Sequence, residues 1–356
     1  MKLRVTTMTP VHIGSGNINQ RYIYHKKDEF LDCYELEDIL DNLRQYMRLD
    51  DFLNLRFDNQ KAKEQILNVF RRNVHYDEIH PKYYLYDYGD DSKHNVSEQI
   101  KSLNRPYIPG STIKGAIINA IYFYFLKQKI NDAIEYIKKE KNVKNLFNYL
   151  YGNEFEEAMT LYSSSLICRD IYFNDQSLIL CHSQRLNMNK GQDFYDYECI
   201  DYNKEVEGEF ISIDLIKKDL FQKRFPKYYK LFKPLFNIDN IFVTIRNYYN
   251  RVLNNDVEYF EEYGKNLGIN YPKVERNSDA CILRIGNSTN YFFKTISLLF
   301  KEKDEKFYSK YFYLFAPTKL GRRNSPKPET MPKTRTIFEF DGEYYLPGLI
   351  KIEKCK

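Results

Sequence analysis

The chain has 356 residues and no tryptophan, and it lacks several features that mark particular classes of protein. Its six cysteines form no C-x-x-C pair and no cluster with histidine, so the sequence predicts neither structural zinc nor a disulfide framework. The longest strongly apolar stretch, residues 115–126, is too short to cross a bilayer and includes Asn119. No signal peptide precedes the strand pattern that begins at Lys2. We therefore expect a cytoplasmic protein that contacts no membrane.

The charge and the aromatic content say little about partners. The net charge of +5 is mildly basic, and charges of both signs alternate along the chain, so an anionic partner fits but is not required. Tyrosine and phenylalanine are abundant, and such rings can stack on nucleic-acid bases. Lysine, asparagine and isoleucine are also plentiful while glycine is scarce, which is typical of an AT-rich coding sequence. The aromatic content alone therefore does not indicate nucleic-acid binding.

The order of the predicted elements indicates an α+β fold, because strands and helices are interleaved irregularly rather than in strict alternation. The predicted strands are 2–9, 21–25, 30–34, 165–173, 177–182, 197–201, 207–213, 281–285, 336–340 and 343–346, with 165–173 paired to 177–182. The predicted helices are 35–47, 61–71, 111–126, 134–150 and 290–301, with a helical, aromatic stretch over 214–267. A polar loop is expected over 87–105 and a mobile basic connection over 301–335.

The length allows about two domains. We assign residues 1–190 to an N-terminal region with a helical insertion. Residues 191–356 form a C-terminal α+β region that contains the aromatic helical segment.

The stretch YIPGSTIKGA, residues 107–116, is the most informative motif of the chain. Gly110 and the proline before it interrupt the preceding element, and Ser111 or Thr112 can then cap a helix whose first turn carries Lys114. This arrangement would place backbone N–H groups, two hydroxyls and an ammonium at the positive end of a helix dipole. Such a helix end is suited to a phosphate.

Two further turns carry small residues and hydroxyls. One is Gly14-Ser15-Gly16 near the N-terminus, and the other runs from Gly286 through Ser288 to residue 289, with Lys294 following it. Each turn offers backbone donors to an anion, although ordinary turn and capping chemistry explains any one of them alone. None fits the nucleotide-binding pattern of a P-loop, so ATP binding is disfavoured.

The remaining chemical candidates leave alternatives open. His12 could act as a general acid or base in RNA cleavage, but a single histidine beside a strand end is more often packed or hydrogen-bonded. The other histidines show no metal-ligand spacing. The basic segment from Lys319 to Arg335, which includes Lys333, is either a solvated linker or a contact to an RNA backbone.

The residues 9–16 and 107–116 together resemble the RAMP superfamily of type III CRISPR effector complexes. Within it, the chain is most similar to the fifth subunit of the type III-A Csm complex. Residues 197–201, Gly286 with Lys294, and residues 332–335 support the resemblance, which extends over nearly the whole chain. Members usually carry an arginine shortly after the Ser-x-x-Lys-Gly element, where this chain has Asn119.

The resemblance implies a ferredoxin-like (RRM-like) RAMP fold, in one or two copies with helical insertions, whose glycine-bearing loops face RNA. It implies a non-catalytic subunit without cofactor or metal that caps the effector filament in antiviral defence. Its partners would be the 3′ part of the CRISPR RNA, the backbone RAMP subunit and the small helical subunit.

The alternatives to this role are a metal-independent RAMP endoribonuclease that processes repeat RNA with His12, and the RAMP subunit that grips the 5′ tag. The candidates for RNA contact are His12, Gly14, Ser15, Gly16, Arg21, Gly110, Ser111, Thr112, Lys114, Gly286, Ser288, Lys294, Lys333 and Arg335.

Overall fold

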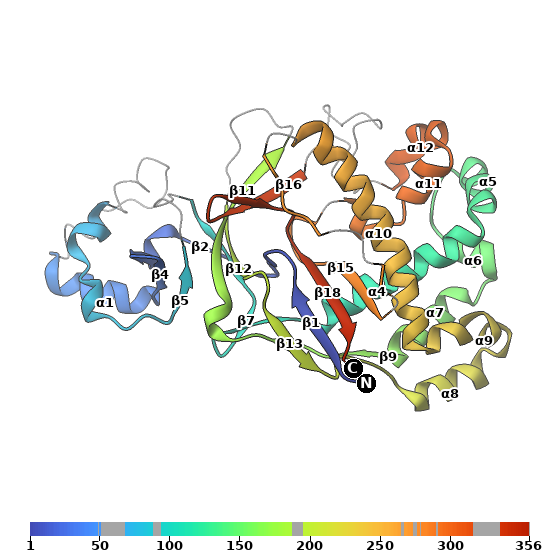
Figure 1. Ribbon diagram of the computed structural model, residues 1–356, viewed down its shortest axis with the longest axis horizontal. Coiled ribbons are helices and arrows are strands. Elements are labelled where there is room, and N and C mark those ends of the chain that lie inside the picture. Colours follow the sequence, from blue (N-terminus) through green and yellow to red (C-terminus); the bar gives the residue numbers. More distant parts are fainter. Residues whose placement is uncertain are drawn as a thin grey trace.

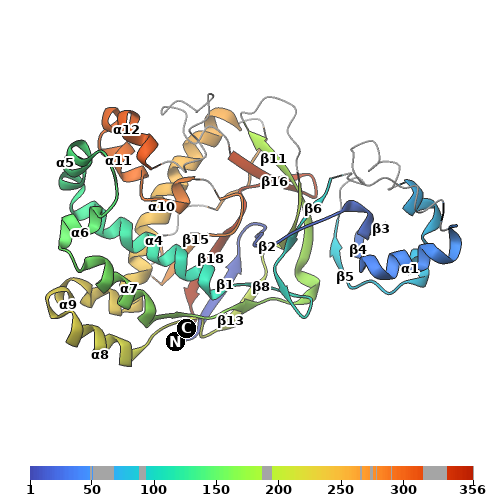
Figure 2. The same ribbon diagram turned by 180° about the vertical axis from the view of Figure 1, so that it is seen from behind.

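The computed structural model describes residues 1–48, 50, 68–87, 94–186, 195–264, 267–272, 276–277, 279–289, 291–315 and 335–355. Figure 1 shows a main body with a small lobe projecting from one side, and Figure 2 shows the same arrangement from behind. Two large sheets form the centre of the main body, and helices gather on the side opposite the lobe. The first and last strands pair with each other, so the two ends of the chain lie together.

A four-stranded antiparallel sheet contains both chain ends. Leu3 and Val5 of its first strand are buried, while Arg4 and Thr6 between them are half-buried, which is the alternation of a sheet with one core face. The core face packs with two long helices, α4 (Gly110–Gln128) and α10 (Ile238–Tyr263), into the largest hydrophobic cluster. In order across the sheet, the strands are β13 (Glu205–Gly208), β1 (Leu3–Thr7), β18 (Leu349–Lys354) and β15 (Ala280–Arg284).

A nine-stranded mixed sheet joins the main body to the lobe. Its path runs through β2 (Gly14–Asn19), β6 (Val96–Gln99), β12 (Asp196–Ile200), β11 (Leu178–Leu186), β5 (Tyr83–Tyr86), β4 (Phe30–Cys33) and β3 (Tyr24–Lys27). Off this path, β16 (Arg335–Phe340) pairs with β11 and with β17 (Glu343–Tyr345). The lobe consists of β3 to β5 and the helix α1 (Leu36–Tyr46). The predicted hairpins at 21–34 and 336–346 and the helix at 35–47 are confirmed.

The helical side of the molecule confirms the aromatic helical segment over 214–267. The helices are α4 (Gly110–Gln128), α5 (Ile130–Glu140), α6 (Leu146–Tyr151), α7 (Phe155–Ser165), α8 (Leu215–Arg224), α9 (Pro226–Phe232), α10 (Ile238–Tyr263), α11 (Leu298–Lys303) and α12 (Glu305–Tyr311). The predicted single helix over 134–150 is wrong, because Lys141 and Asn145 adopt left-handed backbone conformations and separate α5 from α6. The predicted helix over 290–301 is also wrong, since a short 3-10 turn (Tyr291–Lys294) precedes α11.

Two predictions about sheet structure are wrong because the partner strands lie far away in the sequence. The predicted loop over 87–105 contains β6 and β7 (Lys101–Ser102), which pair with β2, β12 and β8 (Arg105–Ile108). Residues 165–173 do not pair with 177–182. They form β9 (Leu166–Cys168), which pairs with β14 (Ile211–Ile213), and β10 (Ile171–Tyr172), which pairs with β8.

The fold is α+β, as expected, and strands from both halves of the chain share both large sheets. The expected boundary at residues 190 and 191 falls within 187–194, outside the described residues, and the division stays a prediction. Of the predicted helix over 61–71, residues 68–71 are described and are helical. Of the basic connection over 301–335, residues 305–311 form α12, and 316–334 lie outside the description.

The close packing between the start of α4 and β9 can be tested by a substitution at Gly110. A Cβ atom at this position would lie 2.1 Å from the backbone oxygen of Cys168, so alanine forces the start of α4 away from β9. We expect Gly110→Ala to destabilise the protein by about 1–3 kcal/mol, as overpacking does. Gly115→Ala is the matched control, because nothing lies within 4 Å of its Cβ and alanine favours a helix by about 0.5–1 kcal/mol. Thermal melting measures both variants, and equal melting temperatures would contradict the close packing of Gly110.

Candidate nucleic-acid interface

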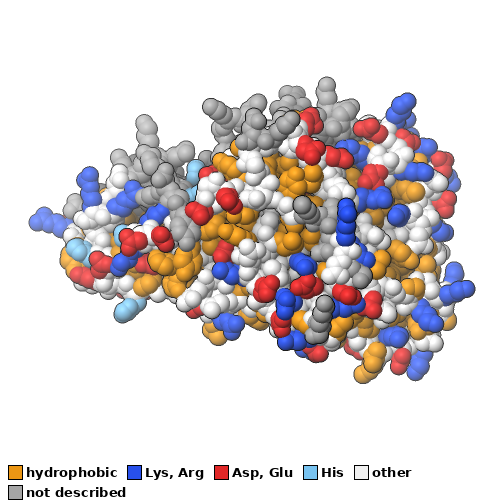
Figure 3. Space-filling view, viewed as in Figure 1, with side chains coloured by type: hydrophobic (Ala, Val, Ile, Leu, Met, Phe, Trp, Pro, Cys, Tyr) orange, Lys and Arg blue, Asp and Glu red, His pale blue; other side chains and the backbone are white. Residues whose placement is uncertain are grey.

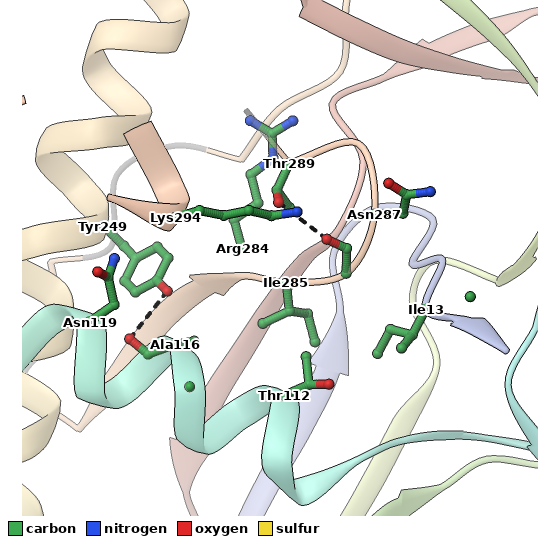
Figure 4. A pocket seen from close by; sticks show the side chains of 13 residues that line it. Ile13, Thr112, Ala116, Asn119, Tyr249, Arg284, Ile285, Asn287, Thr289 and Lys294 are labelled. Atoms are coloured by element: carbon green, nitrogen blue, oxygen red, sulfur yellow. Dashed lines mark hydrogen bonds between the residues drawn. The ribbon is translucent and has the colours of Figure 1, made fainter. Parts of the chain in front are cut away.

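A pocket of about 490 Å³ lies where the three glycine-bearing motifs of the sequence meet (Figure 4). One wall is the turn before β2, another is the side of α4, and a third is the turn that follows β15. We call this the glycine-turn pocket. Its lining residues are Ile13, Gly14, Thr112, Gly115, Ala116, Asn119, Tyr249, Arg284, Ile285, Gly286, Asn287, Thr289 and Lys294.

The turn after β15 is locked against the turn before β2 by backbone contacts. Asn287 donates its N–H to the carbonyl of His12 at 2.9 Å. Gly286 has a φ of 85°, and a Cβ there would lie 2.2 Å from the same carbonyl oxygen, so only glycine fits. The Thr289 hydroxyl donates to the Gly286 carbonyl at 3.1 Å, the bond drawn at this turn in Figure 4. The two turns therefore form one rigid rim.

The pocket is positively charged. None of its lining residues is acidic, whereas Arg284 and Lys294 both contribute to its wall. Figure 4 shows the Lys294 side chain extending along the wall toward the turn at Gly286. Within the described part of the chain, no hydrogen bond or ion pair engages the Lys294 ammonium. Partial burial, and then the charge of Arg284, lower the pKa of Lys294.

Arg284 belongs to a buried ionic group behind the pocket. Its Nη1 donates to Asp256 Oδ2 at 2.6 Å, and Arg335 Nε donates to the other carboxylate oxygen at 2.8 Å. Burial lowers the pKa of Arg284 to about 10, opposed by Asp256 and assisted by Arg335. The guanidinium stays charged at neutral pH. Asp256 thus accepts hydrogen bonds from two arginines, one on each of its carboxylate oxygens.

The helix α4 faces the pocket with its side rather than with its end. The expected cap by Ser111 or Thr112 is wrong, because Pro109 is the N-cap residue and no side chain caps the helix. The Gly110 N–H donates to Asp170 Oδ1 at 2.7 Å, so a carboxylate of the protein occupies the positive end of the dipole. Thr112 lines the pocket one turn before Ala116 and two turns before Asn119.

Three of the expected contacts on α4 lie outside the pocket lining: Gly110, Ser111 and Lys114. Ser111 is exposed. Lys114 lies on another face of the helix, where its charge opposes the burial that raises the pKa of the Cys168 thiol. The helical spacing of 100° per residue separates Lys114 from the face that carries Thr112.

The N-terminal candidates are also placed in different surroundings. His12 is 1% exposed, with Nδ1 at 2.7 Å from the Glu198 carbonyl and Nε2 at 3.2 Å from the Ser97 hydroxyl. Gly14 lines the pocket, whereas Ser15 donates to Glu98 at 2.8 Å and Gly16 is exposed beyond it. The ring of His12 thus supports the turn from behind.

The other candidates lie apart from the lining. Arg21 is buried in the lobe and donates to the Tyr24 carbonyl at 3.1 Å. Ser288 lies beside Tyr197. Burial raises the pKa of Tyr197, and Ser288 lowers it. Arg335 is buried in the ionic group with Asp256, and Lys333 lies outside the described residues.

Nine of the lining residues were not predicted as contacts, and five of these nine have polar side chains: Asn119, Tyr249, Arg284, Asn287 and Thr289. Asn119 could have been found, since helical spacing places it on the face of Thr112. It donates to the Tyr248 hydroxyl at 2.6 Å. Tyr249 donates to the Ala116 carbonyl at 3.4 Å, a contact for which the sequence carries no signal.

Surface charge does not single out the site. Figure 3 shows lysine and arginine interspersed with aspartate and glutamate over the coloured part of one face.

In the described residues, no group of three or more histidine, cysteine, aspartate or glutamate side chains is placed to hold a metal ion. The same residues include no helix with the length and apolar character needed to cross a membrane.

The fold and the pocket define an α+β protein with a basic, glycine-lined site between its sheet and its helices. The chain belongs to the RAMP superfamily, whose family model matches residues 4–293. A Methanocaldococcus jannaschii protein named "CRISPR system Cms protein Csm5" is 24% identical over 302 residues, which are 83% of this chain and 62% of that protein. The chain thus spans less than two thirds of the length of this relative.

Two solved structures share the fold. One is a chain from a cryo-EM structure of a Csm–crRNA–target RNA ternary complex in a type III-A CRISPR-Cas system. It matches with a TM-score of 0.68 and 19% identity, and the match covers 99% of this chain and 100% of that one. The crystal structure of T. onnurineus Csm5 matches with a TM-score of 0.65 and 17% identity, covering 98% and 99%. The RAMP fold expected from the two N-terminal motifs is confirmed.

The burial of His12 predicts a pH dependence of stability. Burial lowers the pKa of the folded imidazole from 6.5 to about 4, so between these pH values the unfolded chain binds the proton more readily. The stability that His12 contributes is present above pH 6.5 and is lost as the pH falls toward 4, to a total of about 3 kcal/mol. We expect His12→Asn, which does not titrate, to lose less stability in this window.

Urea unfolding at several pH values between 7.5 and 4 measures this difference. The control is His80→Asn, which alters an exposed side chain and should keep the pH profile of the unsubstituted chain. Identical profiles for His12→Asn and the unsubstituted chain would show that folding does not lower the pKa of His12.

Proposed function

We propose that this protein is a non-catalytic, RNA-binding subunit of a type III-A CRISPR (Csm) effector complex. In this role it caps the filament at the 3′ end of the CRISPR RNA in antiviral defence in the cytoplasm. Its neighbours are the backbone RAMP subunit and the small helical subunit. The observation that carries the proposal is the glycine-turn pocket, which presents Lys294 without a partner in the described structure and is lined by no carboxylate.

The chemistry of the pocket suits an RNA phosphate. Lys294 offers an ammonium, and none of the lining residues is acidic, so no carboxylate of the wall opposes a bound phosphate. The glycines at 14 and 286 carry no side chain, so the sugar-phosphate backbone can approach the turns closely. Thr112 and Asn287 add neutral hydrogen-bonding groups to the wall. These contacts hold a backbone without reading its sequence.

The comparisons support the choice of complex. The relative from Methanocaldococcus jannaschii is named as a CRISPR system protein, and one matching solved chain comes from an assembly with CRISPR RNA and target RNA. The position at the 3′ end rests on the resemblance of the two N-terminal motifs to the family.

The burial of His12 favours the non-catalytic role over the endoribonuclease alternative. A general base must come within about 2.6–3.2 Å of the 2′-hydroxyl that it deprotonates, directly or through one water. The His12 ring is 1% exposed and both its nitrogens have partners in the protein, so its nitrogens do not reach the pocket surface.

A charge reversal distinguishes a formed phosphate site from bulk charge. We expect Lys294→Glu to weaken the binding of single-stranded RNA by about tenfold or more, because it removes a charge-assisted contact. Lys114→Glu is the matched control, since it changes the charge equally on a nearby element outside the pocket lining. Filter binding over a range of salt concentrations measures both. The milder Lys294→Gln should reduce the log–log salt slope by about 0.7. Equal effects at the two lysines would refute the pocket as the phosphate site.

The capping role is tested in the assembled complex. We expect complexes purified without this subunit to assemble poorly, or to carry CRISPR RNA with shorter or heterogeneous 3′ ends, because the terminal segment is left unprotected. Sequencing of the bound RNA ends measures this. Unchanged ends in an intact complex would contradict the capping role, and photo-crosslinks of this subunit to the 5′ tag would support the alternative subunit.

A further inference from the structure

A second pocket, of about 530 Å³, lies at the junction of the main body and the lobe. It is formed where the end of β5 meets β11, the turn after β12 and the end of β16. None of its lining residues belongs to the glycine-turn pocket. We call it the aromatic pocket after the three rings in its wall, Tyr86, Tyr202 and Phe340.

The three rings are held from behind by other aromatic residues. Tyr202 packs against Tyr345 with ring centres 5.2 Å apart, and Phe340 meets Tyr202 edge-on at 6.5 Å. The ring of Tyr86 lies 4.8 Å from that of Phe30. Tyr86 and Tyr202 are both half-buried. Flat surfaces that are already fixed lose little conformational freedom when a planar ligand stacks on them.

One side of the aromatic pocket is a turn rich in hydrogen-bonding groups. The side chain of Asn174 accepts the N–H of Gln176 at 3.0 Å, and Asp201 donates its N–H to the Ser177 carbonyl at 2.8 Å. These bonds hold the turn against the end of β12. Within the described residues, the side-chain amide of Gln176 makes no hydrogen bond and is exposed at the pocket. An amide offers both a donor and an acceptor to a ligand.

The charge of this pocket differs from that of the glycine-turn pocket. Its one lysine, Lys204, forms an ion pair with Asp201 at 2.8 Å, and Asp341 adds a further carboxylate to the lining. The lining therefore carries no surplus positive charge, which disfavours a phosphate. The chemistry instead suits a planar, uncharged ligand that has hydrogen-bonding edges.

We propose that the aromatic pocket receives one unstacked base of a single-stranded RNA. This inference rests on the proposed function. Bases of single strands are recognised by stacking on aromatic rings and by hydrogen bonds to their edges. The strand β12 runs between the two sites, because Tyr197 near its start lies beside Ser288 in the turn at the glycine-turn pocket, while Tyr202 follows its other end. The backbone of an RNA is held at one site, and a base at the other.

Photo-crosslinking of the full chain tests the proposal without any substitution. A short single-stranded RNA carries one 4-thiouridine, placed at each position in turn, and the crosslinked peptides are identified by mass spectrometry. The expected result is a crosslink to the peptide of Tyr86 or Tyr202 from one position of the RNA. Crosslinks confined to other peptides would overturn the proposal. A crosslink in the assembled complex from Tyr202 to a protein neighbour would also overturn it.

Substitution of Tyr202 separates this site from the phosphate site. Tyr202→Leu removes the ring and should weaken RNA binding about tenfold with an unchanged salt slope, because stacking releases no counterions. Tyr202→Phe keeps the ring and should bind normally, which also shows that a loss in the leucine variant comes from stacking. Tyr149→Leu, at a tyrosine that is 60% exposed on α6, is the matched control.

The two proposals fail in different ways. If the unsubstituted chain binds no RNA, the proposed function fails. If it binds RNA in a manner that depends on Lys294, yet Tyr202→Leu binds normally and Tyr86 and Tyr202 do not crosslink, only the aromatic pocket is refuted.

Discussion

One buried carboxylate, Asp256 on α10, holds together the parts of the chain that frame the glycine-turn pocket. It receives Arg284 from the four-stranded sheet and Arg335 from the nine-stranded sheet, so a single group links both sheets to the longest helix. Charges removed from water are stable only when they are paired and hydrogen-bonded, and the loss of one partner from such a group costs about 3–5 kcal/mol. Arg284 also lines the glycine-turn pocket, so the interaction that supports the fold fixes part of the pocket wall.

A second buried carboxylate, Glu198 on β12, supports the wall of the glycine-turn pocket that is formed by the turn before β2. It accepts the hydroxyls of Tyr24 and Tyr83 from the lobe at 2.8 and 2.7 Å, and it forms an ion pair with Lys101. The backbone carbonyl of the same residue accepts a hydrogen bond from Nδ1 of His12, which precedes the first glycine turn. Both rims of the pocket are therefore set before any ligand arrives. A preformed site avoids the ordering cost that a flexible loop incurs on binding.

Local sequence patterns predicted the helices and strands that can be recognised from their own residues alone. The proline and glycine at 109–110 followed by an apolar run predicted α4, and strict alternation predicted β1. Strand partners were not predictable in this way, because β1 pairs with β18 from the far end of the chain. The short strands β6 and β7 carry little alternation of their own and are held by neighbours distant in sequence. Pairing of this kind depends on packing that a single sequence does not display.

The candidate site was predictable only in part for the same reason. Each glycine turn had a recognisable pattern, but their meeting depends on the fold. Three of the groups that sequence reasoning selected have partners within the protein: Asp170 accepts from the start of α4, Asp256 pairs with Arg335, and Arg21 is buried in the lobe, where it donates to the Tyr24 carbonyl. A positively charged side chain is a candidate for binding a ligand only if no other group of the protein already pairs with it. Lys294 has no such partner in the described residues and lines the pocket, whereas Lys114 lies outside the lining, which is why Lys294 carries the argument for RNA.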